Sequence, residues 1–334
     1  MCLDVNPETS CVIIIDCLLF GGNRRGKAAA NLVATGSYCD LTMNKRELLA
    51  LLQELGLHPS RRLGQNFLLD RNLLSALVRD ADLVSGEHIL EVGPGTGVLT
   101  AALLASGCRV TAIELDHRLA SYVRNRFASY GAQFHLLQGD ACRLDLNSLV
   151  GVSPYRCISN LPYSCSSPFM ATLAALANPP TAMHLLLQKE MAERLTASPG
   201  SKDYGAFTVR MATRYQTEIL RLVPPEVFYP APEVTSAFVR LRQKSVLPAP
   251  ELGDLVSTLA GVVFSQRRKK SFSLLAGRYS ATSVQAAFDA AGLSADVRAA
   301  GISPEAFFIL ARHLSPSNSN SKTKKESPGD AQLQ

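Results

Sequence analysis

A short glycine-rich turn between an apolar strand and a helix restricts the fold of this chain more than any other feature. The segment reads Ile89-Leu90-Glu91-Val92-Gly93-Pro94-Gly95-Thr96-Gly97-Val98. Glycines let the backbone pass close to a ligand, and the first turn of the following helix offers unpaired N–H groups. Such turns are typical of nucleotide-like cofactor sites at the edge of an α/β sheet, so we expect such a sheet here.

Short apolar segments alternate with helical patterns on both sides of this turn. Helical periodicity covers Lys45–Leu55 and Arg71–Leu83. The expected strands are His88–Val92, Arg109–Ile113, Gln133–Gln138, Tyr155–Ser159, Ala182–Gln188, Glu218–Val223 and Ser236–Leu241. This alternation predicts a parallel, doubly wound, Rossmann-like α/β sheet of seven strands.

Changes in composition divide the chain. Residues 1–42 contain an apolar run that is too short to span a membrane and has acidic neighbours that do not suit a targeting signal. We expect them to be a disordered extension, or to precede a true start at Met43. Residues 43–242 should hold the sheet. After a proline-containing break, residues 243–315 should form a small all-helical domain whose last helix has Ser303 as N-cap and Pro304 in its first turn. Residues 316–334 have a disordered composition.

The charge and cysteine content limit the class of partner and site. A net charge of +6 permits a polyanionic partner without requiring one. The eight cysteines form no C-x-x-C pair and the six histidines form no ligand cluster, so we expect no metal and no disulfide framework. Reduced thiols indicate a cytoplasmic protein, in which Cys157 and Cys165 are small packing residues.

Two acidic residues follow the second and third expected strands. Glu114 lies about twenty residues beyond the glycine turn, where a carboxylate can accept hydrogen bonds from ribose hydroxyls. Asp140, in Gly139-Asp140-Ala141, is placed to accept from an adenine amine. Two alternatives remain: a dinucleotide site, which usually has Gly or Ala where Val98 stands, and a turn-capping role for Asp140.

The fourth expected strand ends in Asn160-Leu161-Pro162-Tyr163. An adenine amine is a poor nucleophile because its lone pair is delocalised, and acceptors for its two N–H groups favour a pyramidal nitrogen. The Asn160 amide oxygen can accept one bond, and the Leu161 carbonyl, oriented by the following proline, can accept the other. The Tyr163 ring can stack on an extruded base. The alternative is a simple turn, with Ser167-Pro168 capping the next helix.

From about Arg61 to Leu314 the chain resembles the ribosomal RNA small-subunit adenine N6-dimethyltransferases. The landmarks that carry the resemblance occur in the family's order. They are Leu63-Gly64-Gln65-Asn66-Phe67-Leu68, Glu91-Val92-Gly93-Pro94-Gly95, Ile113-Glu114-Leu115-Asp116, Gly139-Asp140-Ala141, Asn160-Leu161-Pro162-Tyr163, Leu187-Gln188-Lys189-Glu190, Pro230-Ala231-Pro232 and Phe264-Ser265-Gln266-Arg267-Arg268-Lys269.

The resemblance implies an enzyme that uses S-adenosylmethionine to dimethylate two adjacent adenosines in the terminal hairpin loop of 16S RNA. The substrate would be the assembling 30S particle, and we expect a monomer that binds neither metal nor membrane. Tyr163 and Phe228 would sandwich the target adenine. The cofactor site would be lined by Asn66, Leu68, Gly93, Gly95, Glu114, Asp140, Ala141 and Asn160.

Basic residues are the expected RNA contacts. A dense run comprises Arg267, Arg268, Lys269 and Lys270, and Arg61 and Arg62 add a second cluster. The alternative for the run is a solvated helix face. The chain departs from the family at Lys270-Ser271-Phe272-Ser273, and Glu233 and Thr235 replace a commoner Lys and Asp.

Three other functions fit part of the pattern. They are a nucleic-acid-binding factor without activity, a methyltransferase that acts on large-subunit RNA and confers macrolide resistance, and a small-molecule methyltransferase. The intact Asn160 and Tyr163 argue against the first, and the basic second domain argues against the last. The Gln266-Arg267-Arg268-Lys269 segment and the length of the second domain favour the small-subunit enzyme over the second.

Overall fold

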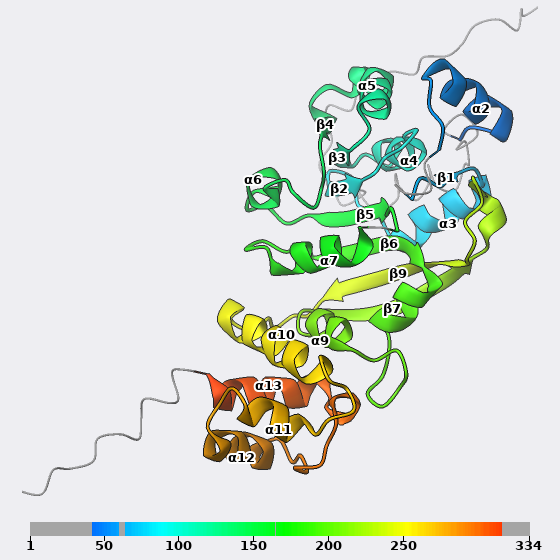
Figure 1. The fold of residues 1–334 in the computed structure, drawn as a ribbon. Helices are drawn as coiled ribbons and strands as arrows, with labels where there is room; N and C mark the ends of the chain where they lie inside the picture. Colours follow the sequence, from blue (N-terminus) through cyan, green and yellow to red (C-terminus); the bar gives the residue numbers. More distant parts are fainter. Residues whose placement is uncertain (1–41, 60–63, 164, 316–334) are drawn as a thin grey trace, which may run out of the picture.

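A mixed sheet of seven strands organises the computed structural model, which describes residues 42–59, 64–163 and 165–315 (Figure 1). The strand order is β4-β3-β2-β5-β6-β9-β7. The strands are β2 (His88–Val92), β3 (Arg109–Glu114), β4 (Phe134–Gln138), β5 (Arg156–Asn160), β6 (Ala182–Gln188), β7 (Tyr215–Val223) and β9 (Ser236–Gln243). The seven-stranded α/β fold expected from the sequence is therefore confirmed.

One strand runs against the others, so the prediction of a parallel sheet is wrong for β9. It pairs antiparallel with both β6 and β7, whereas the pairs from β4 across to β6 are parallel. A short segment without an α-helix joins β7 to β9. Such a connection suits antiparallel neighbours, because a parallel pair is usually joined by a crossover that contains an α-helix.

Both faces of the sheet are buried. Leu90 and Leu185 belong to one hydrophobic cluster, and their strand neighbours Ile89 and Leu186 belong to another. Successive side chains of a strand point to opposite faces, so the two clusters cover the two sides of the sheet.

The helices alternate with these strands and then continue without them. In chain order they are α2 (Lys45–Glu54), α3 (Arg71–Ala81), α4 (Val98–Ala105), α5 (His117–Arg126), α6 (Leu146–Val150), α7 (Ser166–Ala175), α8 (Lys189–Leu195), α9 (Ala206–Ala212), α10 (Pro250–Phe264), α11 (Ser271–Ala276), α12 (Ala281–Ala290) and α13 (Pro304–Leu314). Short 3₁₀ turns occupy Ala128–Gln133, Pro225–Val227 and Ala299–Gly301. The last four α-helices gather beyond the β7 side of the sheet (Figure 1).

Helix starts are partly as expected. Ser303 caps α13 by accepting a hydrogen bond from the Ala306 N–H at 3.1 Å, and Pro304 follows it, which confirms both assignments. The capping role of Ser167-Pro168 was wrong. Cys165 is the N-cap of α7, and the Ser166 hydroxyl closes the turn by donating to the Tyr163 carbonyl at 3.0 Å.

The helical segment has its own hydrophobic core, which also takes in residues that precede the last strand. Tyr204 and Val209 are buried in this core. The Tyr204 hydroxyl donates to the Ile302 carbonyl at 2.7 Å. The loop and helix before β7 thus attach the sheet to the helical segment.

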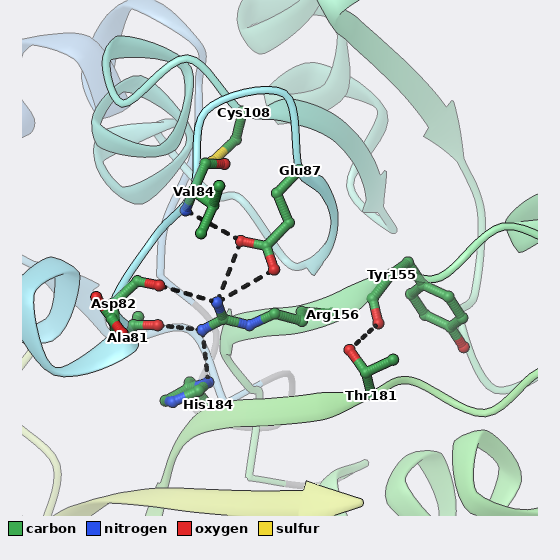
Figure 2. A network of polar contacts seen from close by, with 9 residues as sticks. All are labelled: Ala81, Asp82, Val84, Glu87, Cys108, Tyr155, Arg156, Thr181 and His184. Carbon is green, nitrogen blue, oxygen red and sulfur yellow. Dashed lines mark hydrogen bonds and ion pairs between the residues drawn. The ribbon is translucent and has the colours of Figure 1, made fainter. Parts of the chain in front are cut away.

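A polar cluster around Arg156 connects the amino-terminal ends of central strands to neighbouring segments (Figure 2). The Arg156 guanidinium pairs with Glu87 at 3.1 Å and donates to the carbonyls of Ala81 and Asp82. It also lies 3.3 Å from Nδ1 of His184, whose pKa is lowered to about 3 by burial and by neighbouring arginines. Neutral His184 therefore accepts from Arg156, and the cluster joins α3 to β5 and β6.

A second, two-stranded sheet joins distant parts of the chain. β1 (Phe67–Leu68) pairs antiparallel with β8 (Phe228–Tyr229).

Among the described residues, none of the helices is both long and apolar enough to cross a bilayer. The expectations for the first forty-one residues, for Arg61 and Arg62, and for the tail from residue 316 lie outside the described ranges.

Candidate functional site

A cavity of about 240 Å³ lies at the carboxyl ends of β2, β3, β4 and β5. The residues expected to bind the cofactor meet in its wall, although they come from separate segments. The lining includes Asn66, Leu68, Gly93, Gly95, Glu114, Asp140, Ala141, Asn160 and Pro162. The expected catalytic residues Leu161, Tyr163 and Phe228 are not among its lining residues.

The glycine turn is shaped by its backbone. Gly93 and Gly95 have φ values of +68° and +60°, in the left-handed region that favours glycine. A Cβ on Gly95 would lie 3.3 Å from the ring of Phe67, and one on Gly93 would lie 3.4 Å from Pro162. The turn therefore packs closely against β1 and against the segment after β5.

Glu114 and Asp140 stand at the ends of adjacent strands. Glu114 accepts hydrogen bonds from the Gly95 N–H at 3.1 Å and the Asp116 N–H at 3.0 Å. Burial raises the pKa of Glu114, and these backbone bonds oppose the rise. Asp140 accepts from the Cys142 N–H at 2.9 Å, so the turn-capping role considered from the sequence is present. Both residues nevertheless line the cavity.

The amide of Asn160 has a fixed orientation. Its Nδ2 donates to the backbone carbonyl of Asn66 at 3.0 Å, which leaves Oδ1 as the acceptor of the side chain. The adjacent Ser159 hydroxyl accepts from the Val92 N–H at 2.9 Å and joins β5 to the last residue of β2, just before the glycine turn. Leu161 is buried. Because Asn66 lies in the loop before β1, this loop determines that Oδ1 is the atom of Asn160 that can accept a further hydrogen bond.

The two aromatic residues differ in environment. The Tyr163 hydroxyl lies 2.6 Å from Oγ of Ser236, and its side chain is partly exposed. Phe228 is buried in a hydrophobic cluster with Leu68, its partner in the small sheet. In this structure Phe228 therefore occupies a core position, and Tyr163 follows Pro162, which lines the cavity, without lining the cavity itself.

Glu91 is a further site residue that our sequence prediction did not include. It lines the cavity and is only 1% exposed. Its Oε2 accepts from the Thr100 hydroxyl at 2.7 Å. Burial and the nearby Glu114 raise the pKa of Glu91 to about 8, despite the bond from Thr100. The available signal was an acid inside an otherwise apolar strand, a frequent mark of a functional site.

Replacement of Glu91 by glutamine is expected to flatten the pH dependence of stability. Below its ordinary pKa of 4.5 the carboxyl is protonated in both states. As the pH rises further, the unfolded chain ionises while folded Glu91 keeps its proton, so the wild type loses about 1.4 kcal/mol per pH unit. Between about pH 5 and pH 7.5 this amounts to about 3 kcal/mol, which Glu91→Gln should retain.

Urea unfolding without cofactor at several pH values measures this difference. Glu251→Gln is the matched control, because Glu251 is exposed at the start of α10 and should keep the wild-type slope. Equal slopes for Glu91→Gln and the wild type would show that Glu91 ionises normally in the folded protein.

The basic run is not uniform. Arg267 donates to the carbonyls of Lys202 and Tyr204 and lies over the ring of Phe264, so its guanidinium is engaged within the protein. Lys270 pairs with Asp296 at 2.6 Å on an exposed surface. Arg268 and Lys269 are exposed, and their side chains have no ion-pair partner within the described ranges. They are the members of the run most available to phosphates.

The cysteines near the site are not activated. Burial raises the pKa of Cys157 to about 12 and that of Cys165 to about 11. Cys165 contributes to the cavity wall and Cys157 to the core beneath it. In the part of the chain that the structure describes, no group of three or more His, Cys, Asp or Glu side chains is placed to hold a metal ion.

Comparisons with known proteins agree with this arrangement. Residues 57–315 match the family model of ribosomal RNA adenine dimethylase. The chain is 38% identical over 257 residues to ribosomal RNA small subunit methyltransferase A of Pseudomonas putida, covering 76% of this chain and 94% of that protein. The protein of the same name from Clostridium acetobutylicum is 33% identical over 259 residues, covering 76% and 93%.

Solved structures show the same fold. The 23S rRNA methyltransferase ErmE is 26% identical with a TM-score of 0.59, and the match covers 75% of this chain and 99% of ErmE. A dimethyladenosine transferase from Plasmodium falciparum is 24% identical with a TM-score of 0.59, covering 73% and 95%. With the family model spanning most of its length, the chain belongs to the ribosomal RNA adenine dimethylase family.

Proposed function

We propose that this protein uses S-adenosylmethionine to dimethylate the N6 amines of two adjacent adenosines in the 3′-terminal hairpin loop of 16S RNA. The acceptor is the assembling small subunit, and the modification accompanies its maturation. The observation that carries the proposal is the cavity in which the Asn160 amide oxygen accepts no hydrogen bond from any residue that the structure describes and stands beside a glycine turn and two strand-end carboxyl groups. Relatives named for small-subunit methylation support the choice of RNA.

The cavity suits the proposed cofactor. Its wall offers the Glu114 carboxyl group for ribose hydroxyls and Asp140 for the adenine amine, and close backbone approach is possible at Gly93 and Gly95. Asn66, Leu68 and Ala141 complete the proposed binding surface. The transferred methyl group is carried on the positively charged sulfur of S-adenosylmethionine, an electrophile that needs no acid to activate it.

The chain's own groups act on the adenine amine. In the first of the two transfers, the Asn160 Oδ1 atom accepts one N–H, and the Leu161 carbonyl, held by the following proline, accepts the other. These two bonds favour a pyramidal nitrogen with its lone pair available for attack. Attack on the methyl group of bound S-adenosylmethionine would break the methyl–sulfur bond, release the neutral thioether and leave the nitrogen positively charged, and the nitrogen would then lose a proton to solvent. The proposed role of Asn160 and Leu161 is therefore to orient the amine without a covalent enzyme intermediate.

The Tyr163 ring is the proposed stacking platform for the extruded base, worth about 1–3 kcal/mol. Phe228 is the proposed second face of the sandwich. Since Phe228 is buried against Leu68 in this structure, base binding requires the β1–β8 sheet to shift. Tyr163 can therefore support the base without rearrangement, whereas Phe228 contacts the base only after the small sheet shifts.

RNA affinity is proposed to come from phosphate contacts of Arg268 and Lys269, with Lys270, Arg61, Arg62 and Arg267 as further members of the expected set. In this proposal the segment 243–315 is the RNA-binding domain, and the protein acts as a cytoplasmic monomer. Specificity arises from RNA shape and the flipped base, since helical RNA is read poorly from its deep groove.

The direct test incubates the purified protein and S-adenosylmethionine with small subunits that lack the modification. Nucleoside mass spectrometry should then detect N6,N6-dimethyladenosine. Large-subunit particles are the comparison substrate, because the resemblance to ErmE makes a large-subunit enzyme the second candidate. A folded preparation that binds the cofactor but modifies neither particle refutes the proposed reaction, and modification of the large subunit alone selects the second candidate.

A further inference from the structure

We infer that Ser236 is a positioning residue that holds the Tyr163 ring in place through a hydrogen bond between their hydroxyl groups. The two oxygens lie 2.6 Å apart, although the residues are 73 positions apart in the chain. The inference rests on the proposed function, in which the Tyr163 ring supports the target base. Ser236 is not one of the residues expected from the sequence, and it does not line the cavity.

The position of Ser236 is rigid because the sheet fixes it. It is the first residue of β9, opposite Gln188 at the end of β6 and Val223 at the end of β7. Its side chain is fully buried. A hydroxyl with paired strands on both sides is a firm anchor for a partly exposed ring.

The rest of Tyr163 is also held, so the hydroxyl bond completes a set of restraints. The Tyr163 carbonyl accepts from the Ser166 hydroxyl at 3.0 Å. On the other side, a Cβ on Gly64 would lie 2.9 Å from the Tyr163 nitrogen, which shows how closely the loop before β1 approaches. Backbone restraints place the Cα, but side-chain torsions still allow the ring to turn. The bond to Ser236 restricts those torsions.

The chemistry of the phenol is consistent with this role. Burial raises the pKa of Tyr163, and the bond to Ser236 opposes that rise. Tyr163 therefore remains a neutral phenol at physiological pH, which suits a stacking surface beside a neutral amine. No proton transfer is assigned to it.

A set of hydroxyl deletions tests the inference. Ser236→Ala and Tyr163→Phe each remove one side of the bond while keeping the aromatic ring, and each should lower kcat/KM for small subunits about fivefold to tenfold. The double variant should lose no more than either single variant, because the same bond is missing in all three. Affinity for S-adenosylmethionine should stay within about twofold of the wild-type value, because the lost bond orients the ring that supports the target base and does not contact the cofactor.

Ser257→Ala is the matched control. Across residues 42–59, 64–163 and 165–315, its hydroxyl bonds only within α10, to the Gly253 carbonyl at 3.0 Å, so turnover should stay at the wild-type level. The inference would be overturned if the losses of the two single variants multiplied in the double variant. It would also be overturned if Ser236→Ala had an unaltered kcat/KM. Tyr163→Phe keeps the test decisive should Ser236→Ala fold poorly, because its own unaltered kcat/KM would overturn it too.

A readout without catalysis separates this inference from the proposed function. In protein labelled with ¹³C at the tyrosine rings, Tyr163→Phe identifies the NMR signal of Tyr163 by its disappearance. The pKa read from that signal should rise in Ser236→Ala and stay unchanged in Ser257→Ala. An unmoved titration shows that the bond does not form and overturns the inference. An inactive wild type with the shifted titration instead rejects the proposed function, and with it the role of the ring, while the bond itself stands.

Discussion

Replacement of Asn160 by alanine is expected to lower the rate of methyl transfer by about a thousandfold while leaving RNA affinity nearly unchanged. The Asn160 amide is held by the Asn66 carbonyl with Oδ1 free to accept, so truncation removes a preorganised acceptor for the adenine amine. Single-turnover methyl transfer to small subunits measures the loss, and filter binding of the same subunits measures affinity.

Two further variants sharpen this test. Asn160→Asp retains an acceptor but replaces the Nδ2 donor with an oxygen that repels the Asn66 carbonyl. Its rate of methyl transfer should therefore lie between those of Asn160→Ala and the wild type. Asn125→Ala is the control, because Asn125 is exposed on α5. Wild-type turnover in Asn160→Ala would remove the proposed mechanism.

Replacement of Glu114 by alanine is expected to weaken S-adenosylmethionine binding by about a hundredfold. Hydrogen bonds to a charged group contribute about 1.5–3 kcal/mol each, and a carboxylate can accept from both ribose hydroxyls. Glu114 also accepts from the Gly95 N–H, so its loss frees the glycine turn. Isothermal titration calorimetry measures the dissociation constant of the cofactor.

Glu114→Gln provides the graded comparison. Glutamine keeps the size of the side chain and one accepting oxygen, so its affinity should fall about tenfold. Stability in urea, measured beside binding, separates lost ligand contacts from a disturbed turn. Normal cofactor binding by Glu114→Ala would exclude Glu114 from the binding surface.

The strands of this fold were predictable because each is a compact apolar segment. β2 and β6 have the bounds expected from the sequence, whereas β7 begins earlier, at Tyr215. Its first residues include the polar Gln216 and Thr217, which an edge strand tolerates but an apolar pattern does not reveal. The apolar pattern of β9 carried no information about its direction, since apolar residues in a buried strand are the same in either orientation, and the connection from β7 without an α-helix was the available signal.

The wall of the candidate cavity was largely predictable from motifs, but its fine contacts were not. Glu114 and Asp140 follow strand ends, and parallel strands bring such ends together. The bond from Asn160 to the Asn66 carbonyl and the pairing of Leu68 with Phe228 join segments far apart in the chain. A two-residue strand carries no periodic signal, so sequence reasoning could place neither contact.

The reversed direction of β9 has a consequence for how this site can diversify. Under the proposed function, the segments that leave the parallel strands would hold the cofactor, whereas the stretch from Phe228 to Ser236 enters β9 from the same edge of the sheet. Glu233 and Thr235, where the resemblance described above predicts Lys and Asp, lie in this incoming stretch. Under the proposed function, substitutions in this one part of the chain would alter the acceptor preference and leave the cofactor-binding segments unchanged.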